Sequence, residues 1–234
     1  MPDEERRAEL AANLADVRKR IASACAAAGR DPAGVTLVAV TKTFPASDVR
    51  LLAGLGITDV AENRDQEGAP KAAQLTDLPL TWHFVGQLQS NKARSVAGYA
   101  DVVQSVDRPR LVTALSAAAV RAGRLLCCLV QVSLEESGGR GGVAPAEAPA
   151  LADAIAGAEA LVLGGVMAVA PLGADPVPAF ERLAAAAAAV RGSHPAAGVV
   201  SAGMSGDLEA AIACGATHVR VGTALLGGRR AIVR

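Results

Sequence analysis

The stretch Val35-Thr-Leu-Val-Ala-Val-Thr-Lys-Thr43 holds a short apolar run that ends directly before a lysine. Apolar runs of this length, rich in β-branched residues, are typical of strands buried on both faces of a parallel sheet. The chain repeats the pattern, each time followed by a stretch that suits a helix. We expect strands at residues 35–41, 57–61, 81–85, 101–105, 126–133, 160–168, 197–201 and 217–221.

The segments between these strands are rich in Ala and Leu and are compatible with helices. They include residues 47–55, 90–97, 108–122, 144–156, 177–190 and 205–214. An amphipathic helix precedes the first strand, because apolar residues recur there at steps of three and four from Leu10 to Cys25, and it should end near Gly29. Eight strands alternating with helices predict one (β/α)8 barrel of the TIM type over residues 1–234, with an extra N-terminal helix. A doubly wound open sheet is the alternative.

The composition argues against several classes of function. The net charge is zero and only 2% of residues are aromatic, so we expect no nucleic-acid partner. The charged N-terminus, MPDEERRAEL, does not have the apolar core of a secretory signal, and later apolar stretches are broken by Gly, Pro or charge. We therefore expect a cytoplasmic protein without a membrane span, and a monomer, since no strongly apolar exposed face stands out.

Cysteine and histidine spacing predicts no metal site. Cys25, Cys127, Cys128 and Cys214 form no C-x-x-C motif and fall in apolar segments, so we interpret them as buried thiols. His83, His194 and His218 share no ligand spacing.

Lys42 is one of only four lysines, and it stands where the first strand ends. The C-terminal ends of the strands form the functional face of such barrels. We expect a desolvated rim at this position, which favours a free amine, and free amines form imines with aldehydes. One hypothesis is a Schiff base between Lys42 and pyridoxal 5'-phosphate (PLP). The alternative is a lysine that extends from the strand end to solvent.

Two elements near the C-terminus are suited to phosphate. Strand seven leads into Ser201-Ala-Gly-Met-Ser-Gly206, where the glycines allow close approach of a ligand and Ser205 can donate its hydroxyl. Strand eight leads into Gly222 and Thr223, which open the last helical turn. Phosphate commonly binds between the loops after strands seven and eight of a barrel. Ser205 as a simple helix N-cap is the alternative.

Three further polar residues are placed near this face. Side chains two residues apart in a strand point to the same side, so Arg220 faces the same way as Gly222 and should point into the barrel. A buried guanidinium there needs a partner. That partner is either a pyridine nitrogen or a carboxylate such as Glu62. Asn63 follows strand two and either contacts a cofactor ring or turns the chain. His83 is interpreted as a core histidine with satisfied hydrogen bonds.

Five ordered motifs resemble the PLP homeostasis family of the YggS type: VAVTKTFP, DVAENRDQE, WHFVGQLQSNK, GVMAVAP and AGMSGDLEAAIACGATHVRVGTALLG. The resemblance covers nearly the whole chain. It implies a barrel similar to the N-terminal domain of alanine racemase, with PLP on Lys42. It also implies phosphate contacts at Ser205, Gly222 and Thr223, and Arg220 beside the pyridine nitrogen. The implied role is to carry or buffer PLP, with PLP-dependent apo-enzymes as candidate recipients, and to support vitamin B6 and amino-acid balance.

The chain departs from the family pattern at a few positions. Phe44 and Arg140, the latter followed by Gly142, stand where many members have lysines, which puts any transfer route through those lysines in doubt. Leu226 replaces an aromatic residue. The rival interpretation is a PLP-dependent racemase, but racemisation needs a second base, and the only tyrosine, Tyr99, precedes strand four at the opposite end of the barrel. A barrel enzyme using Lys42 as an aldolase-type base is a third interpretation.

Overall fold

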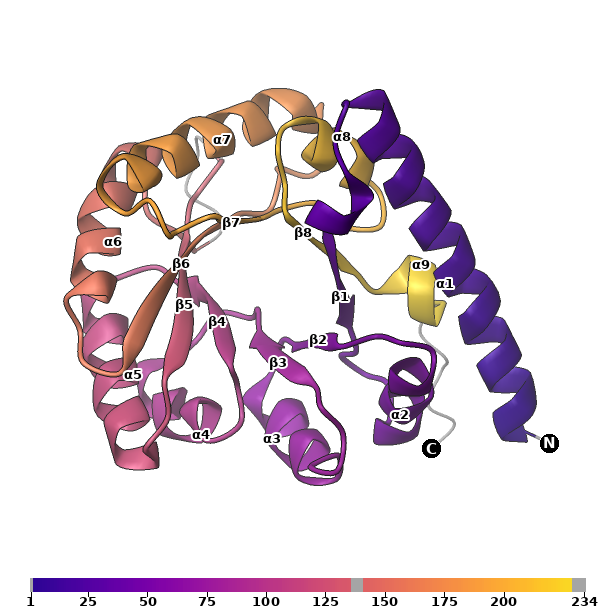
Figure 1. The fold of residues 1–234 in the computed structure, drawn as a ribbon. Helices are drawn as coiled ribbons and strands as arrows, with labels where there is room; N and C mark the ends of the chain where they lie inside the picture. Colours follow the sequence, from indigo (N-terminus) through magenta and orange to yellow (C-terminus); the bar gives the residue numbers. More distant parts are fainter. Residues whose placement is uncertain (1, 136–140, 229–234) are drawn as a thin grey trace.

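Eight parallel strands close into a barrel in which each strand pairs with the next and β8 pairs with β1 (Figure 1). This computed structural model describes residues 2–135 and 141–228. The strands are β1 (Thr36–Val40), β2 (Asp59–Glu62), β3 (Thr81–Phe84), β4 (Val102–Val106), β5 (Leu126–Gln131), β6 (Leu161–Met167), β7 (Val199–Ser201) and β8 (His218–Val221). All eight fall within two residues of the predicted bounds, so the predicted barrel is confirmed and the open-sheet alternative is wrong.

Helices cover the outside of the barrel. They are α1 (Pro2–Ala27), α2 (Ala46–Gly54), α3 (Asp65–Ala73), α4 (Ala93–Ala97), α5 (Pro109–Ala122), α6 (Ala148–Ala156), α7 (Pro176–Ser193), α8 (Leu208–Ala213) and α9 (Thr223–Leu226). Short 3-10 turns occur at Pro32–Gly34, Ser90–Lys92 and Pro145–Glu147. No helix in the two described ranges is long and apolar enough to cross a bilayer.

The extra helix α1 lies along the edge of the barrel beside α8, α9 and α2 (Figure 1). Its apolar stripe, Leu10, Leu14, Val17, Ile21 and Cys25, is buried. The stripe belongs to the same core cluster as the outward-facing residues of β1, β2 and β8. Burial of such a stripe is the main stabilisation available to an amphipathic helix. The predicted N-terminal helix is therefore confirmed, and it packs outside β1 and β8, the two strands whose pairing closes the barrel.

Helix α3, whose segment contains Gly68 and Pro70, is the helix expected after the second strand, although no bounds were predicted for it. Two local predictions differ from the structure. The last helix before β8 starts at Leu208, with Asp207 as its N-cap residue, so the alternative that made Ser205 an N-cap is wrong. Of the four cysteines, Cys25 and Cys128 are buried as predicted, whereas Cys127 and Cys214 are only partly buried. No group of three potential metal ligands occurs among the residues that the structure describes.

Candidate functional site

A cavity of about 490 Å³ opens at the C-terminal ends of β1, β7 and β8. Five of the six predicted site residues line it together: Lys42, Ser205, Arg220, Gly222 and Thr223. The loop after β6, from Ala170 to Ala174, forms the remaining wall. The volume is in the range of ordinary small-molecule pockets. An amine, a guanidinium and two hydroxyls thus converge on one hollow from strands at opposite ends of the sequence.

Lys42 follows the end of β1 by two residues, and its side chain is exposed. The expectation of a desolvated rim is therefore wrong, because the protein's own atoms leave this amine open to solvent. The backbone on either side of it is nevertheless fixed by α3. Lys71 Nζ donates to the carbonyl oxygen of Thr41 at 2.9 Å, and the N–H of Thr43 donates to Glu67 Oε2 at 2.9 Å.

Thr43 also has a left-handed backbone conformation, with φ of 68°. A β-branched residue adopts this conformation only at a cost of about 1–3 kcal/mol, so neighbouring contacts must maintain it. The bond from its N–H to Glu67 is one such contact. The turn that carries Lys42 is thus held from both sides by one helix.

A buried ion pair lies behind this turn. Lys71 Nζ is 2.5 Å from Glu62 Oε1, and the same oxygen accepts a bond from Thr41 Oγ1 at 2.5 Å. Burial raises the pKa of Glu62, against the opposing effect of Lys71 and the two hydrogen bonds. Because Glu62 points toward α3, it is unavailable to Arg220. The predicted alternative of an Arg220–Glu62 salt bridge is therefore wrong.

The two predicted phosphate elements face each other. Ser205 Oγ accepts bonds from Thr223 Oγ1 and from the N–H of Ala224, both at 3.2 Å. Gly222 packs tightly against β1, since a Cβ there would lie 3.3 Å from the carbonyl oxygen of Val40. Gly203 has a φ of +89° and leaves no room for a side chain. Gly203 thus lies against α8 and β8, and Gly222 lies against β1. The predicted close approach of a ligand to these glycines stays a prediction.

Helix α1 braces these elements from outside. Arg20 Nη2 donates to the carbonyl oxygen of Ser205 at 2.9 Å, while its Nε bonds Glu209. Asn13 Nδ2 donates to the carbonyl oxygen of Leu225 at 3.0 Å. Arg6 donates to the carbonyl oxygen of Leu226 at 2.9 Å and also pairs with Asp48. The first helix thus satisfies carbonyl groups at the loop and at the end of α9.

Arg220 points into the barrel, as its parity predicted, and is 5% exposed. Its Nη1 donates to Ser201 Oγ at 2.7 Å and its Nη2 to the carbonyl oxygen of Ala168 at 2.8 Å. Burial lowers the pKa of Arg220 to about 10, with Asp207 acting in the opposite direction. The guanidinium is therefore still a cation at neutral pH, and it lies at the floor of the cavity.

Asn63 lies apart from the other five residues. It lines a neighbouring hollow of about 480 Å³, with Gln87, Gln89 and Lys92, on the same face of the barrel. Its backbone touches Gly86 closely, because a Cβ on that glycine would lie 1.9 Å from the Asn63 carbonyl oxygen. His83, in contrast, is a core residue as predicted, with hydrogen bonds at both ring nitrogens.

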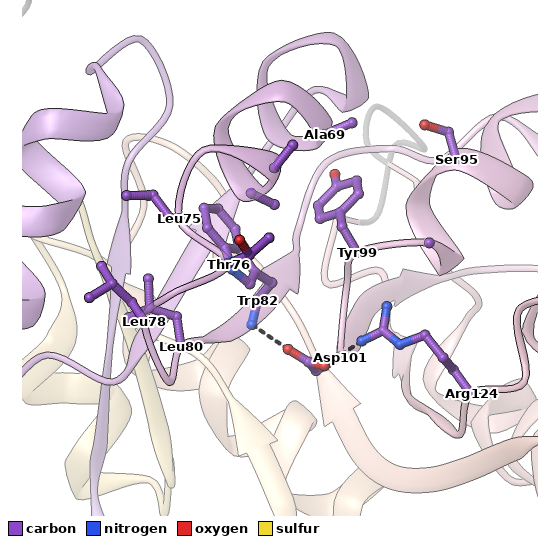
Figure 2. Close-up of a pocket in the computed structure, with 13 residues that line it drawn as sticks. Ala69, Leu75, Thr76, Leu78, Leu80, Trp82, Ser95, Tyr99, Asp101 and Arg124 are labelled. Carbon is purple, nitrogen blue, oxygen red and sulfur yellow. Dashed lines mark hydrogen bonds and ion pairs between the residues drawn. The ribbon is translucent and has the colours of Figure 1, made fainter.

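Tyr99 lines a different hollow, of about 560 Å³, outside the barrel wall beneath α3 and α4. Figure 2 shows its ring beside Trp82 and above the Asp101–Arg124 pair. Its hydroxyl lies against Gly68 of α3, and burial raises the pKa of Tyr99 well above its ordinary value. This tyrosine is not among the residues that line the Lys42 cavity.

Comparison with known proteins identifies the family. The model of the alanine racemase N-terminal domain matches residues 6–230. A pyridoxal phosphate homeostasis protein of Mycobacterium tuberculosis is 44% identical over 245 residues, which cover 97% of this chain and 95% of that protein. The chain belongs to the PLP homeostasis protein family. The resemblance expected from the five motifs is thereby confirmed.

Solved structures agree with the assignment to the PLP homeostasis protein family. PipY of Synechococcus elongatus, in a structure with PLP bound, is 36% identical, covers 94% of this chain and 100% of that one, and has a TM-score of 0.81. Alanine racemase from Streptomyces coelicolor has a TM-score of 0.73 at 20% identity, covering 94% of this chain and 58% of the enzyme. At that identity the likeness concerns the fold alone, and it agrees with the predicted racemase-type barrel.

The family departures have structural counterparts. Phe44 is half-buried beneath Arg6, whose guanidinium carbon is 5.7 Å from the ring centroid, so this position is occupied by a packing contact. Leu226 is buried in the core under α1. Gly142 has a φ of 136° and packs against Ser133. The prediction for Arg140 lies outside the described residues.

Sequence reasoning missed the residues that support the site. Lys71 and Glu67 lie on α3, for which no bounds were predicted, and Gln104 and Ser201 are polar residues that interrupt or end the apolar runs of β4 and β7. That interruption was the available signal, because a polar side chain buried in a barrel interior requires a hydrogen-bond partner.

Proposed function

We propose that this chain binds PLP through a Schiff base on Lys42 and serves to carry or buffer the cofactor. The observation that supports the proposal best is the convergence of Lys42, Ser205, Thr223 and Arg220 on one cavity at the carboxyl ends of the strands. The PLP-bound structure of a 36% identical relative supports the same ligand. Formation of the Schiff base joins the Lys42 amine to the aldehyde carbon and releases water.

The residues present fit the chemistry of the cofactor. The hydroxyls of Ser205 and Thr223, with the backbone at Gly222, are proposed to hold the phosphate, since donors there face one another across the mouth. Arg220 is proposed to face the pyridine nitrogen from the floor of the cavity. Asn63 remains in the proposed set as a contact for ring substituents, reaching from the neighbouring hollow. When bound, PLP supplies an aldehyde for imine chemistry and a ring that withdraws electrons.

We favour a carrier over an enzyme because of two features of the site. A guanidinium at the ring nitrogen leaves that nitrogen unprotonated, which weakens the ring as an electron sink. No tyrosine is among the described residues that line the cavity, since Tyr99 lines another hollow, and the carboxylate that lines it, Asp207, accepts a bond from the N–H of Met204 at 2.6 Å. We further propose that the protein is a cytoplasmic monomer that supports vitamin B6 and amino-acid homeostasis and passes PLP to apo-enzymes.

Borohydride reduction of the PLP-loaded protein, followed by peptide mapping, tests the attachment. The chain offers its own controls, because Lys19, Lys71 and Lys92 are the only other lysines. We expect the reduced label on Lys42 and none after Lys42→Ala. Label on another lysine of the unmodified chain would refute the assignment.

A turnover assay separates the carrier from the racemase. The loaded protein should bind PLP stoichiometrically, restore activity to a PLP-dependent apo-enzyme, and leave alanine and serine unracemised. Racemisation at ordinary enzyme rates, on the order of 1 per second or faster, would favour the enzyme instead. Slow exchange of the α-proton would not, because imine formation alone acidifies that position.

A further inference from the structure

A chain of buried hydrogen bonds runs through the barrel interior from Arg220 to the opposite end. Arg220 Nη1 is 2.7 Å from Ser201 Oγ, and Ser201 Oγ is 2.7 Å from Gln104 Oε1. Gln104 Nε2 is 2.8 Å from His83 Nδ1, and His83 Nε2 is 3.0 Å from Asp59 Oδ1. Five residues from five strands (β2, β3, β4, β7 and β8) thus form one continuous path.

The direction of every bond in this path follows from its first member. A guanidinium only donates, so Ser201 Oγ accepts from Arg220 and its single hydrogen serves Gln104 Oε1. The Gln104 amide nitrogen then donates to His83 Nδ1, which must be unprotonated. His83 therefore carries its proton on Nε2 and donates it to Asp59. Every hydrogen points from Arg220 toward Asp59.

The path has a charge at each end and is dry in the middle. Ser201 and Gln104 are 0% exposed and His83 is 2% exposed. Asp59 accepts a second bond, from Thr58 Oγ1 at 2.7 Å. Burial acts to raise the pKa of Asp59, but the bonds from His83 and Thr58 outweigh it and the pKa falls. A cation and a carboxylate are therefore joined through neutral, polarised groups, which strengthens each bond of the chain.

We propose that Asp59, His83, Gln104 and Ser201 are positioning residues that fix the Arg220 guanidinium for the pyridine nitrogen of PLP. This inference rests on the proposed function. Arg220 bonds Ser201 through Nη1 and the Ala168 carbonyl through Nη2, so the path sets the rotation of the guanidinium plane. Without the path, the Ser201 hydroxyl is free to turn, and Arg220 loses a fixed acceptor. Recognition of the ring nitrogen should then weaken, while the contacts to phosphate and the Lys42 attachment are unaffected.

The test compares PLP with 1-deaza-PLP, in which CH replaces the ring nitrogen. The unmodified protein should bind PLP about tenfold or more tightly than the deaza analogue, as expected when a charged donor loses its acceptor. Gln104→Met interrupts the path with a side chain of similar volume. We expect this variant to bind PLP less than about threefold more tightly than 1-deaza-PLP. Borohydride reduction should still place the PLP label on Lys42. A merely structural role would weaken both ligands equally and leave the ratio unchanged.

The neighbouring residue provides a matched control. Ser105 lies next to Gln104 on β4, is buried, and its hydroxyl has no hydrogen-bond partner in the described parts of the chain. Ser105→Ala should leave the PLP preference at its original value. Asp59→Asn, at the more accessible end of the path, is the second variant, and it decides the test if Gln104→Met does not fold. It should reduce the preference by about threefold, since it removes the charge that polarises the chain.

The outcomes separate this inference from the proposed function. If the unmodified chain does not take PLP on Lys42, the proposed function fails. If PLP is bound on Lys42 but the two ligands bind equally well, Arg220 does not recognise the ring nitrogen and the positioning role is overturned alone. An unchanged preference in folded Gln104→Met or Asp59→Asn overturns it as well.

Discussion

Replacing Lys71 with methionine should expose the energetic cost of the ion pair behind Lys42. The change leaves the Glu62 carboxylate, whose side chain is 0% exposed, without its cation, and it removes one of the two donors to the Thr41 carbonyl, the other being the N–H of Phe44 at 3.1 Å. Removing one partner of a buried pair costs about 3–5 kcal/mol. Methionine keeps the helix propensity and most of the volume of the lysine stem. The effect should therefore come from charge and hydrogen bonding rather than from a cavity.

A second route gives a similar magnitude. The isolated carboxyl can avoid burying a charge by taking up a proton, and its ordinary pKa is 4.5. Protonation at pH 7 then costs about 3.4 kcal/mol, which corresponds to a melting temperature lower by roughly 7–14 °C for a chain of this length. At pH 5 the same protonation costs only about 0.7 kcal/mol. The lost bond to Thr41 adds about 1 kcal/mol at either pH.

The sign of the pH dependence follows from proton uptake. Folded Lys71→Met binds a proton at Glu62 that the unfolded chain releases above pH 4.5, so its stability relative to the unmodified protein falls as pH rises. Urea denaturation at pH 5 and pH 7 measures this difference. Lys92→Met is the matched control, since Lys92 is 41% exposed and lies 3.9 Å from Asp65, and it should cost less than about 1 kcal/mol at both values.

A double variant isolates the charge. When Lys71→Met is combined with Glu62→Gln, the loss of unfolding free energy relative to the unmodified protein should be the same at pH 5 and pH 7. A penalty below about 1 kcal/mol at pH 7 for Lys71→Met alone, or an equal penalty at both pH values, would refute this account of the ion pair.

Three further changes test other parts of the structure. Ser205→Ala with Thr223→Ala should weaken PLP retention, each by about 1.5–3 kcal/mol, with the melting temperature of the ligand-free protein nearly unchanged; equal affinity would move the phosphate site elsewhere. Burial, with nearby His83 and Arg220, lowers the pKa of His218 to about 4, so the folded protein resists protonation there and should lose about 2 kcal/mol of stability between pH 6.5 and pH 5, a loss that His218→Asn should remove. Gly86→Ala should cost about 1–3 kcal/mol in thermal unfolding, because its Cβ would overlap the neighbouring carbonyl at 1.9 Å.

Each of these has a simple check. An equally steep pH profile in His218→Asn would show that another group titrates. Gly54→Ala, at a helical glycine where an added Cβ would meet no heavy atom within 4 Å, is the control for Gly86→Ala and should be neutral or slightly stabilising.

The strands and the five clustered site residues could be predicted because each rests on a local pattern. Apolar runs define the strands, and parity along β8 places Arg220 inside the barrel. The common geometry of barrels then brings the ends of β1, β7 and β8 to one face. No knowledge of side-chain partners is needed for any of these steps.

The failures share a different cause, which is tertiary context. Helix α3 contains Gly68 and Pro70, both poor helix formers, so propensity does not give its bounds, and Gly68 leaves no room for a side chain beside Tyr99 and Glu62. The sequence leaves Glu62 open as an alternative partner of Arg220, because alternation along a strand does not say on which side of the barrel wall each carboxylate lies. The exposure of Lys42 depends on the loops around it, which periodicity does not report.

The seam between β1 and β8 determines when the site can exist during synthesis. Lys42 follows the first strand, whereas Arg220, Gly222 and Thr223 belong to the last strand and the turn after it. A nascent chain that has not yet emerged as far as residue 223 therefore has the Lys42 amine. It does not yet have the Arg220 guanidinium or the second proposed phosphate element, Gly222 and Thr223. A ligand that contacts both Lys42 and the turn after β8 must therefore bind after the last strand has been translated. Once bound, it connects the first and last strands, so that dissociation of the ligand and opening of the barrel are thermodynamically linked.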